Sequence, residues 1–220
     1  FIVGGTGFIG YHTTLELLKR GHSVSTLSLP DIDLSNWYPE EVKVSHGNVF
    51  EMSENDLMAL VSGHDALVYA IGPDDRNKIK GSAYDFFHKY LVEECCRILA
   101  AARIAGIRKC VLTGSYFAYF DRKYPEKKLS ERHPYIKCRI EQEKEAISEG
   151  KDTMSVSLIE LPYIFGTMPK RVPLWEDILF RRLHDHFIVF YPKGGSNMIA
   201  VESVAEAIAG AIERGEHSAR

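Results

Sequence analysis

Three glycines, Gly4, Gly7 and Gly10, follow the first apolar residues of the chain at three-residue spacing. In a strand–turn–helix, the first glycine permits the tight turn, the second lets the backbone approach a pyrophosphate, and the third lets the helix pack closely. A helix beginning near Phe8 directs free N–H groups at the phosphates, and its dipole adds about half a positive charge there. The alternative is a tight turn without a ligand. An apolar strand before the glycines and an amphipathic helix after them favour a dinucleotide-binding loop.

The rest of the chain supplies elements that can position such a loop. The expected strands cover residues 1–3, 23–28, 42–46, 66–71, 109–113 and 156–161, and the expected helices cover residues 8–20, 53–61, 83–105 and 135–148. Strands that alternate with helices indicate crossover connections and a mainly parallel sheet. The apolar runs ALVYAI and CVL are typical of strands buried on both faces. We therefore expect an α/β fold of Rossmann type with a doubly wound parallel sheet.

After Gly166 the pattern loosens, with a helix expected over residues 175–183, a strand over 187–190 and an amphipathic helix over 201–214. We interpret residues 1–165 as an NAD(P)-binding domain and residues 166–220 as the start of a truncated C-terminal substrate lobe. The chain begins inside an expected strand without an initiating Met, so we expect residues to precede Phe1.

Composition excludes several classes of partner. The 220 residues are 45% hydrophobic and 26% charged, with a net charge of −3, which gives no reason to expect binding of nucleic acid or an anionic membrane. No apolar run approaches the roughly 20 residues that span a bilayer. The four cysteines show no CxxC spacing, which favours buried thiols and a reducing, cytoplasmic setting. His184 and His186 flank Asp185, but no further ligand has suitable spacing, so no metal site is expected.

Several segments, in order, resemble the extended branch of the short-chain dehydrogenase/reductase superfamily, the NAD-dependent epimerase/dehydratase family. GGTGFIG is similar to its TGxxGxxG loop, GNVFE to its GDxxD segment, RKCVLTGSYFAYF to its fifth strand and HPYIKCRIEQE to its catalytic helix. LIELPYIFG resembles the sixth strand with the loop that closes over the nicotinamide. The resemblance implies cofactor contacts from Gly4, Thr6, Gly7, Phe8, Ile9, Gly10, Ser28, Asn48, Val49, Ala70, Ile71, Gly72, Thr113, Tyr135, Arg139, Pro162, Tyr163 and Ile164.

The same resemblance implies a catalytic set of Ser115, Tyr135 and Arg139, with Tyr135 as acid/base and Ser115 holding the substrate oxygen. Residues 135 and 139 share a helix face, but residue 139 is Arg where the family has Lys. A cation about 4 Å away supplies the roughly 4 kcal/mol needed to ionise a phenol at neutral pH, although Arg releases no proton and its planar fork binds ribose hydroxyls differently. The alternative is that Arg139 pairs with Glu143 as a solvated charge.

A second departure is Leu91, which occupies the position where the family keeps an asparagine that supports a proton relay. A leucine there is better explained as core packing. Two functions therefore stay open. The first is an NAD(P)-dependent oxidoreductase or epimerase/dehydratase acting on a small carbonyl or hydroxyl compound, such as a sugar derivative. The second is a non-catalytic NAD(P)-binding sensor or partner-binding protein.

Cofactor choice and assembly are weakly encoded. The segment SLPD begins at the last residue of the second expected strand. Its Ser28 and Leu29 are neither the acid of NAD sites nor the Arg of NADP sites, while Asp31 lies further along. The sequence slightly favours NAD over NADP as the cofactor. The long helix near Phe86–Leu91 could pack on a second copy of the chain in a homodimer, or be covered by the chain's own core.

Overall fold

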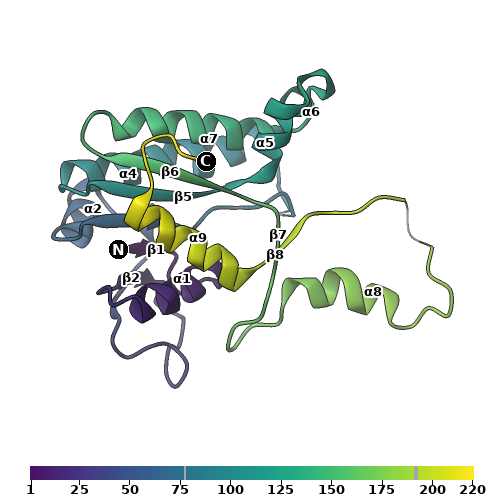
Figure 1. Ribbon diagram of the computed structural model, residues 1–220, viewed down its shortest axis with the longest axis horizontal. Helices are drawn as coiled ribbons and strands as arrows, with labels where there is room; N and C mark the ends of the chain where they lie inside the picture. Colours follow the sequence, from purple (N-terminus) through teal and green to yellow (C-terminus); the bar gives the residue numbers. More distant parts are fainter. Residues whose placement is uncertain (77, 191–192) are drawn as a thin grey trace.

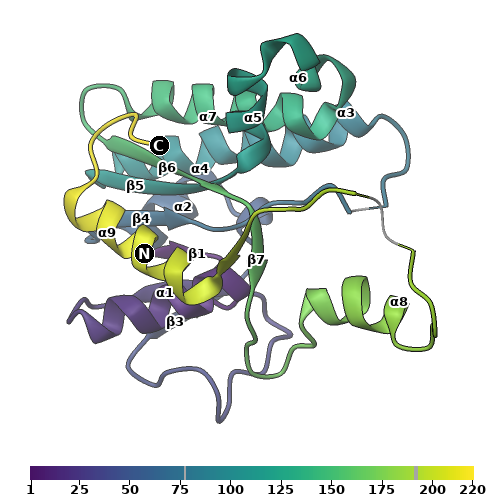
Figure 2. The same cartoon turned by 45° about the vertical axis from the view of Figure 1, so that its right-hand side comes forward.

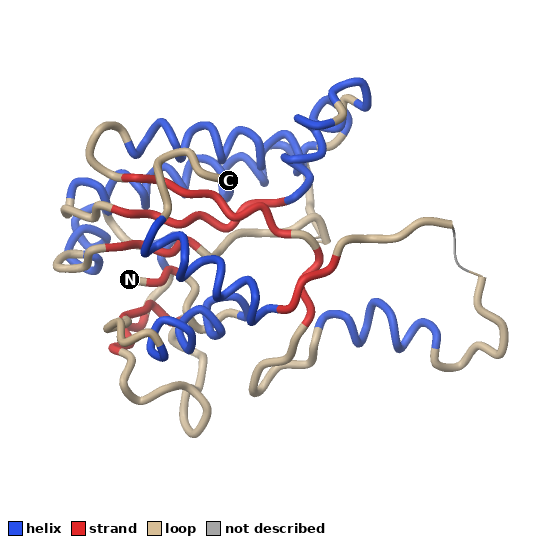
Figure 3. The backbone as a smooth tube through the Cα atoms, in the orientation of Figure 1, coloured by secondary structure: helices blue, strands red, loops and turns tan. Residues whose placement is uncertain are grey.

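A computed structural model describes residues 1–76, 78–190 and 193–220. Six strands form one parallel sheet in the order β3-β2-β1-β4-β5-β6 (Figure 1; Figure 3). These strands are β1 (Ile2–Val3), β2 (Ser25–Ser28), β3 (Lys43–His46), β4 (Ala66–Tyr69), β5 (Lys109–Ser115) and β6 (Ser155–Leu161). The chain runs outward from β1 to one edge and then returns to build the other half. This confirms the doubly wound α/β fold, and it brings the carboxyl ends of all six strands to one edge of the sheet.

Helices cover both faces of the sheet, as Figure 2 shows. The helices α1 (Phe8–Lys19) and α9 (Val201–Arg214) lie on one face, and α2 (Glu54–Val61), α4 (Glu94–Ile104) and α7 (Pro134–Gly150) lie on the other. The alternation of side chains along β4 explains the two cores, because successive residues point to opposite faces. Val68 packs with the α1 and α9 side, whereas Leu67 and Tyr69 pack with α2, α4 and α7.

The core on one face of the sheet includes side chains of α9, which belongs to the segment expected to begin a second lobe. Val204, Ile208 and Ala209 are fully buried with Ile2 and Val111 of the sheet. The strong amphipathic pattern of this helix predicts such burial. The domain boundary near residue 165 stays a prediction. Although α9 follows that boundary in the sequence, it packs on the sheet of the first domain.

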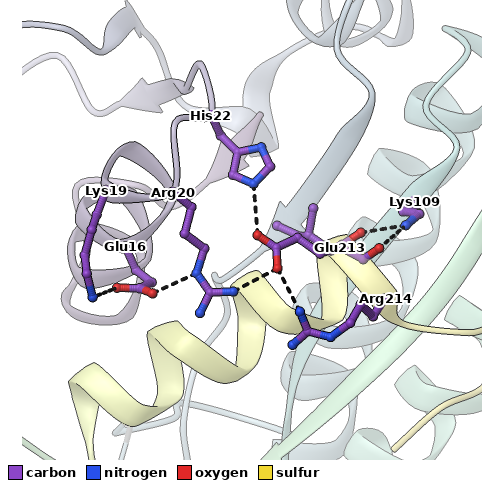
Figure 4. Close-up of polar contacts among 8 residues, drawn as sticks. Glu16, Lys19, Arg20, His22, Lys109, Glu213 and Arg214 are labelled. Carbon is purple, nitrogen blue, oxygen red and sulfur yellow. Dashed lines mark hydrogen bonds and ion pairs between the residues drawn. The ribbon is translucent and has the colours of Figure 1, made fainter.

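A polar cluster ties the ends of α1 and α9 together (Figure 4). Arg20 donates from Nε to Glu16 at 2.7 Å and from Nη1 to Glu213 at 2.9 Å. Lys109 of β5 donates from Nζ to the backbone oxygens of Ile212 and Glu213 at 2.8 and 3.0 Å. These carbonyls end α9 without an intrahelical partner, so the ammonium group caps the helix.

The region between β6 and α9 differs most from expectation. β7 (Tyr163–Phe165) and β8 (Met198–Ala200) form a separate two-stranded parallel sheet, which the sequence analysis did not predict. A π-helical turn (Glu176–Phe180) and α8 (Arg181–Leu183) form the expected helix, which stands away from the main sheet (Figure 1). The strand expected over residues 187–190 was wrong. Residues 187–188 form a bend and residues 189–190 have no regular structure. Phe187 and Phe190 are exposed, and within the described residues no strand pairs with this run.

Two further helices follow β5, α5 (Tyr116–Lys123) and α6 (Leu129–Arg132). The helix expected over residues 83–105 is present as α3 (Ala83–Phe87), a π-helical stretch (His88–Glu93) and α4. No helix in the described residues is long and apolar enough to span a membrane.

Candidate functional site: a dinucleotide cradle and a buried tyrosine–arginine pair

The glycine loop between β1 and α1 has three distinct steric demands. Gly4 has a φ of +92°, and a Cβ there would lie 2.6 Å from the backbone oxygen of Ala70. A Cβ at Gly10 would lie 2.0 Å from the backbone oxygen of Gly4. At Gly7 a Cβ would meet only the same oxygen, at 3.1 Å, so its other side is open. The loop is therefore packed tightly against other backbone at Gly4 and Gly10, whereas at Gly7 it has free space on one side.

The open side carries the amino end of α1. Gly7 caps the helix, and the first intrahelical bond runs from Tyr11 N to Gly7 O at 2.8 Å, so the amides of Phe8 and Ile9 precede the hydrogen-bond ladder. No acidic side chain lies in the first turn of this helix. Bare amides and the positive end of a helix dipole fit a pyrophosphate well.

A buried polar network that the sequence analysis missed holds this loop. Thr26 Oγ1 accepts from Gly5 N at 3.1 Å and donates to Ile2 O at 2.8 Å. The Tyr38 hydroxyl donates to Gly5 O at 3.1 Å and lies 3.2 Å from Thr14 Oγ1. Burial raises the pKa of Tyr38, so it remains a donor at neutral pH. Tyr38 lies in an irregular loop, and no local pattern in the sequence marks it.

The other expected cofactor residues lie at the carboxyl ends of the strands, around the same edge. Ser28 ends β2 and donates through Oγ to Leu29 O at 3.2 Å, and the Asn48 side chain accepts from Phe50 N at 3.2 Å in the turn that follows β3. Ala70 and Ile71 follow β4 and reach Gly4. The remaining positions have these surroundings: Thr6 and Val49 are buried, Gly72 has a φ of +133°, Tyr163 is exposed, and Pro162 follows β6.

A cavity of about 360 Å³ opens beside Phe8. It is lined by Phe8, Ile164 and Trp175 together with the cations Lys170 and Arg171. Phe8 and Ile164, separated by most of the chain, therefore share one wall, while the indole of Trp175 is fixed by a 2.9 Å hydrogen bond to Gly166 O. The cavity has room for a small molecule next to the glycine loop.

The expected catalytic residues lie where β5 ends and α7 begins. Ser115 is the last residue of β5, and its Oγ accepts from Phe117 N at 3.4 Å at the start of α5. Tyr135 is the second residue of α7 and packs edge-on against Phe87, with ring centroids 5.2 Å apart. Arg139 donates from Nε to the Tyr135 hydroxyl oxygen at 3.0 Å. The helical spacing thus brings the phenol and the guanidinium into direct contact, as expected.

Arg139 is not a solvated helix charge, so that alternative was wrong. Its side chain is buried, with 8% exposed, and its Nη1 donates to Gln142 Oε1 at 2.8 Å and to Thr113 O at 3.4 Å. Glu143 instead receives Arg122, with Nη1 and Oε2 3.0 Å apart. Spacing alone could not decide this, because Glu143 is also four residues from Arg139.

Glu143, also on α7, belongs to a second group of charged side chains, together with Arg122 and Glu160. Burial, followed by the charge of Glu160, raises the pKa of Glu143 to about 7, against the opposing charges of Arg122 and Arg220. Arg122 also contacts Glu160, so it bridges the two carboxylates. Glu143 therefore changes from its neutral to its charged form close to neutral pH. Its carboxyl group packs against Gly114 of β5, where a Cβ would lie 3.2 Å from Oε1.

Leu91 is core packing, as expected. It lies in the π-helical stretch, is fully buried, and shares a cluster with Phe87 and Tyr135. A Cβ at Gly72 would lie 2.8 Å from Leu91 Cδ2, so Leu91 and the end of β4 are in tight contact. Within the described residues no group of three or more His, Cys, Asp or Glu is arranged to hold a metal ion.

Comparison with known proteins agrees with this fold and with the binding of a dinucleotide. Residues 4–157 match the model of a family described as NAD(P)H-binding. The chain belongs to this family of NAD(P)H-binding domains, which agrees with its resemblance to the extended short-chain dehydrogenase/reductase, or epimerase/dehydratase, group. A mouse (Mus musculus) sterol-4-alpha-carboxylate 3-dehydrogenase, decarboxylating, is 24% identical over 98% of this chain and 59% of its own length. The chain thus spans about three fifths of that relative.

Solved structures share the fold. The Bordetella bronchiseptica enzyme WbmH in complex with NAD+ superposes with a TM-score of 0.74 at 16% identity, over 100% of this chain and 73% of WbmH. A UDP-N-acetylglucosamine 4-epimerase from Bacillus cereus gives a TM-score of 0.71 at 15% identity, over 99% of this chain and 72% of that enzyme. At these identities the likeness establishes the fold alone.

Proposed function

We propose that this chain is the cofactor-binding part of an NAD(P)-dependent oxidoreductase or epimerase/dehydratase acting on a small carbonyl or hydroxyl compound, such as a sugar derivative. One observation carries the catalytic part of this proposal: the buried contact of 3.0 Å between Arg139 Nε and the Tyr135 hydroxyl. A buried cation held against a phenol stabilises the oxyanion that forms when the phenol gives up its proton. The relatives named as dehydrogenase and epimerase support the same class.

The chain's residues divide the work as follows. The glycine loop and the first amides of α1 bind the diphosphate, and the dinucleotide, when bound, supplies or accepts the hydride. Tyr135 donates its proton to a carbonyl oxygen during reduction, or removes one from a hydroxyl during oxidation. Ser115 hydrogen-bonds the same substrate oxygen. Arg139 holds the tyrosine oxygen and stabilises its ionised form without itself exchanging a proton.

The test is turnover with a panel of carbonyl and hydroxyl substrates, followed through nicotinamide absorbance. Tyr135→Phe and Arg139→Met should each lower kcat by about 10²-fold or more, the usual worth of a positioned acid/base. Lys144→Met changes the exposed side of the same helix and should leave kcat unchanged, since Lys144 is 81% exposed. Equal turnover by wild type and Tyr135→Phe would remove Tyr135 from the mechanism.

The second function, a non-catalytic NAD(P)-binding sensor, is favoured by Leu91, which fills the space beside Gly72 with apolar atoms. This function predicts tight dinucleotide binding with no turnover of any substrate. Nicotinamide fluorescence titrations with NADH and NADPH measure the binding, and turnover separates the two functions.

Cofactor preference and assembly remain proposals. A slight preference for NAD rests on the absence of a cation at Ser28 and Leu29. In a homodimer through the long helix, Phe86 and Tyr90 would form the contact, because Phe87 and Leu91 are buried in the chain's own core. Sedimentation equilibrium of wild type and Tyr90→Glu would detect that dimer.

A further inference from the structure

The orientation of Arg139 depends on a residue that the comparison with the family did not single out. A buried guanidinium needs acceptors for its donors, because water cannot supply them. Nε is directed at Tyr135, so Nη1 determines the plane of the group, and its shorter contact is the 2.8 Å bond to Gln142 Oε1. The bond to Thr113 O is longer, at 3.4 Å.

Gln142 is fully buried and lies one turn after Arg139 on the same face of α7. Within the described parts of the chain its Nε2 meets no oxygen or nitrogen acceptor, and the Cys95 thiol lies on that side of the amide. A thiol is only a weak acceptor, so this contact gives little reason for an amide here. Rotating the amide by half a turn would put Nε2 against Nη1, two donors facing each other. The bond to the guanidinium therefore fixes the orientation of the amide.

The other groups around Arg139 come from three neighbouring elements. Tyr69 of β4 and Cys95 of α4 lie close enough to interact with its charge, but burial raises the pKa of both well above its ordinary value, so both stay neutral. Asp74, in the loop after β4, is also within reach of the charge. Burial acts to raise the pKa of the Asp74 carboxyl, but hydrogen bonds from Arg76, with a contribution from Arg139, hold it below its ordinary value.

We propose that Gln142 is a positioning residue, which holds the Arg139 guanidinium in the plane that directs Nε at the Tyr135 oxygen. The proposal rests on the proposed function of Tyr135 and Arg139. A neutral acceptor suits this task because it orients the cation without neutralising it. A carboxylate at the same place would bind the cation more strongly but offset its charge.

Three variants separate orientation from charge. Gln142→Met keeps the size of the side chain but removes the acceptor, Gln142→Glu keeps the acceptor and adds charge, and Lys144→Met is the matched control on the exposed side of α7. We expect Gln142→Met to lower kcat by at least about tenfold, the equivalent of one hydrogen bond to a charged group. KM for the dinucleotide should change little. Gln142→Glu should restore kcat at high pH, with the pH–rate profile displaced to higher pH.

A double variant that combines Gln142→Met with Arg139→Met tests whether Gln142 acts through Arg139. If Gln142 acts through Arg139, the Gln142→Met change has no further effect once Arg139 is replaced. A full additional loss in the double variant, or a wild-type kcat and pH profile in Gln142→Met, overturns the proposal while the role of Arg139 stands.

A second readout works if no substrate is turned over. In ¹⁵N-labelled protein, the NMR signal of the Arg139 Nε–H group, identified by its absence in Arg139→Met, follows the contact with Tyr135. The signal should move in Gln142→Met and stay in place in Lys144→Met. An unmoved signal in Gln142→Met overturns the positioning role. Loss of turnover by Arg139→Met without any change by Tyr135→Phe would instead contradict the proposed function.

Discussion

Replacing Glu143 by Gln should change how the stability of the protein depends on pH. The Glu143 side chain is 3% exposed, and its pKa is raised from 4.5 to about 7, first by burial and then by Glu160. The folded state therefore holds the Glu143 proton more tightly than the unfolded chain. This contribution to stability is complete below the unfolded pKa and is lost as the pH rises through the folded pKa.

The magnitude follows from the shift. A rise from 4.5 to about 7 is 2.5 units, and at 1.36 kcal/mol per unit it corresponds to about 3 kcal/mol. The free energy of unfolding of wild type relative to Glu143→Gln should thus fall by about 3 kcal/mol between about pH 4.5 and 7. In Glu143→Gln the amide stays neutral, so this part of the pH dependence disappears.

Urea unfolding followed by circular dichroism over that pH range measures the difference directly. Glu145→Gln is the control, because Glu145 lies on the same helix with 46% of its side chain exposed. It should follow the wild-type pH dependence. A difference between wild type and Glu143→Gln that is constant across the range would refute the reasoning, since it would mean that Glu143 titrates alike in the folded and unfolded states.

Three further outcomes are expected from the cofactor side of the sheet. Gly10→Ala places a Cβ 2.0 Å from Gly4 O, so thermal unfolding should show a loss of at least about 1–3 kcal/mol; an unchanged Tm would contradict the close packing of α1. Thr26→Val leaves Gly5 N without its 3.1 Å acceptor, which should cost about 1–3 kcal/mol in urea unfolding and weaken dinucleotide binding, whereas full stability and affinity would show that the loop does not need this support. Leu29→Arg, at an exposed position directly after β2, should raise the affinity for NADPH relative to NADH in fluorescence titrations. An unchanged ratio would place the adenosine ribose elsewhere.

Most of the fold could be predicted because local patterns and the global structure agree. The buried strands β4 and β5 are continuous apolar runs, and the glycine spacing fixes how β1 joins α1. The run over residues 187–190 looks equally strand-like, but a strand needs a partner strand. Among the residues that the structure describes none pairs with this run, and the sequence gives no sign of that. For the same reason the short pair β7 and β8 could not be predicted, since its pairing joins segments far apart in the chain.

The candidate site could be predicted as a set of positions, but not as a set of contacts. Helical spacing puts both Tyr135 and Glu143 within reach of Arg139, and only the packing of α7 against β5 determines that the guanidinium turns inward. Gln142 and Tyr38 carry no signal in the sequence, because their roles depend on burial against elements distant in the chain. Tertiary contacts therefore determine that Arg139 pairs with Tyr135 and not with Glu143.

The central claim is that the amino-terminal loop binds the diphosphate of a dinucleotide. Gly7 has an ordinary φ of −85°, and a Cβ there would meet only Gly4 O, at 3.1 Å, so Gly7→Val should fold after a small local shift yet block the approach of the diphosphate. Calorimetric titration of wild type and Gly7→Val with NADH and NADPH is the most direct measurement. We predict binding of at least one dinucleotide by wild type and a loss of at least about 100-fold in affinity, equivalent to about 3 kcal/mol, in a variant that still unfolds cooperatively on heating. Equal affinity of the two proteins, or no binding by wild type at millimolar dinucleotide, would contradict the account.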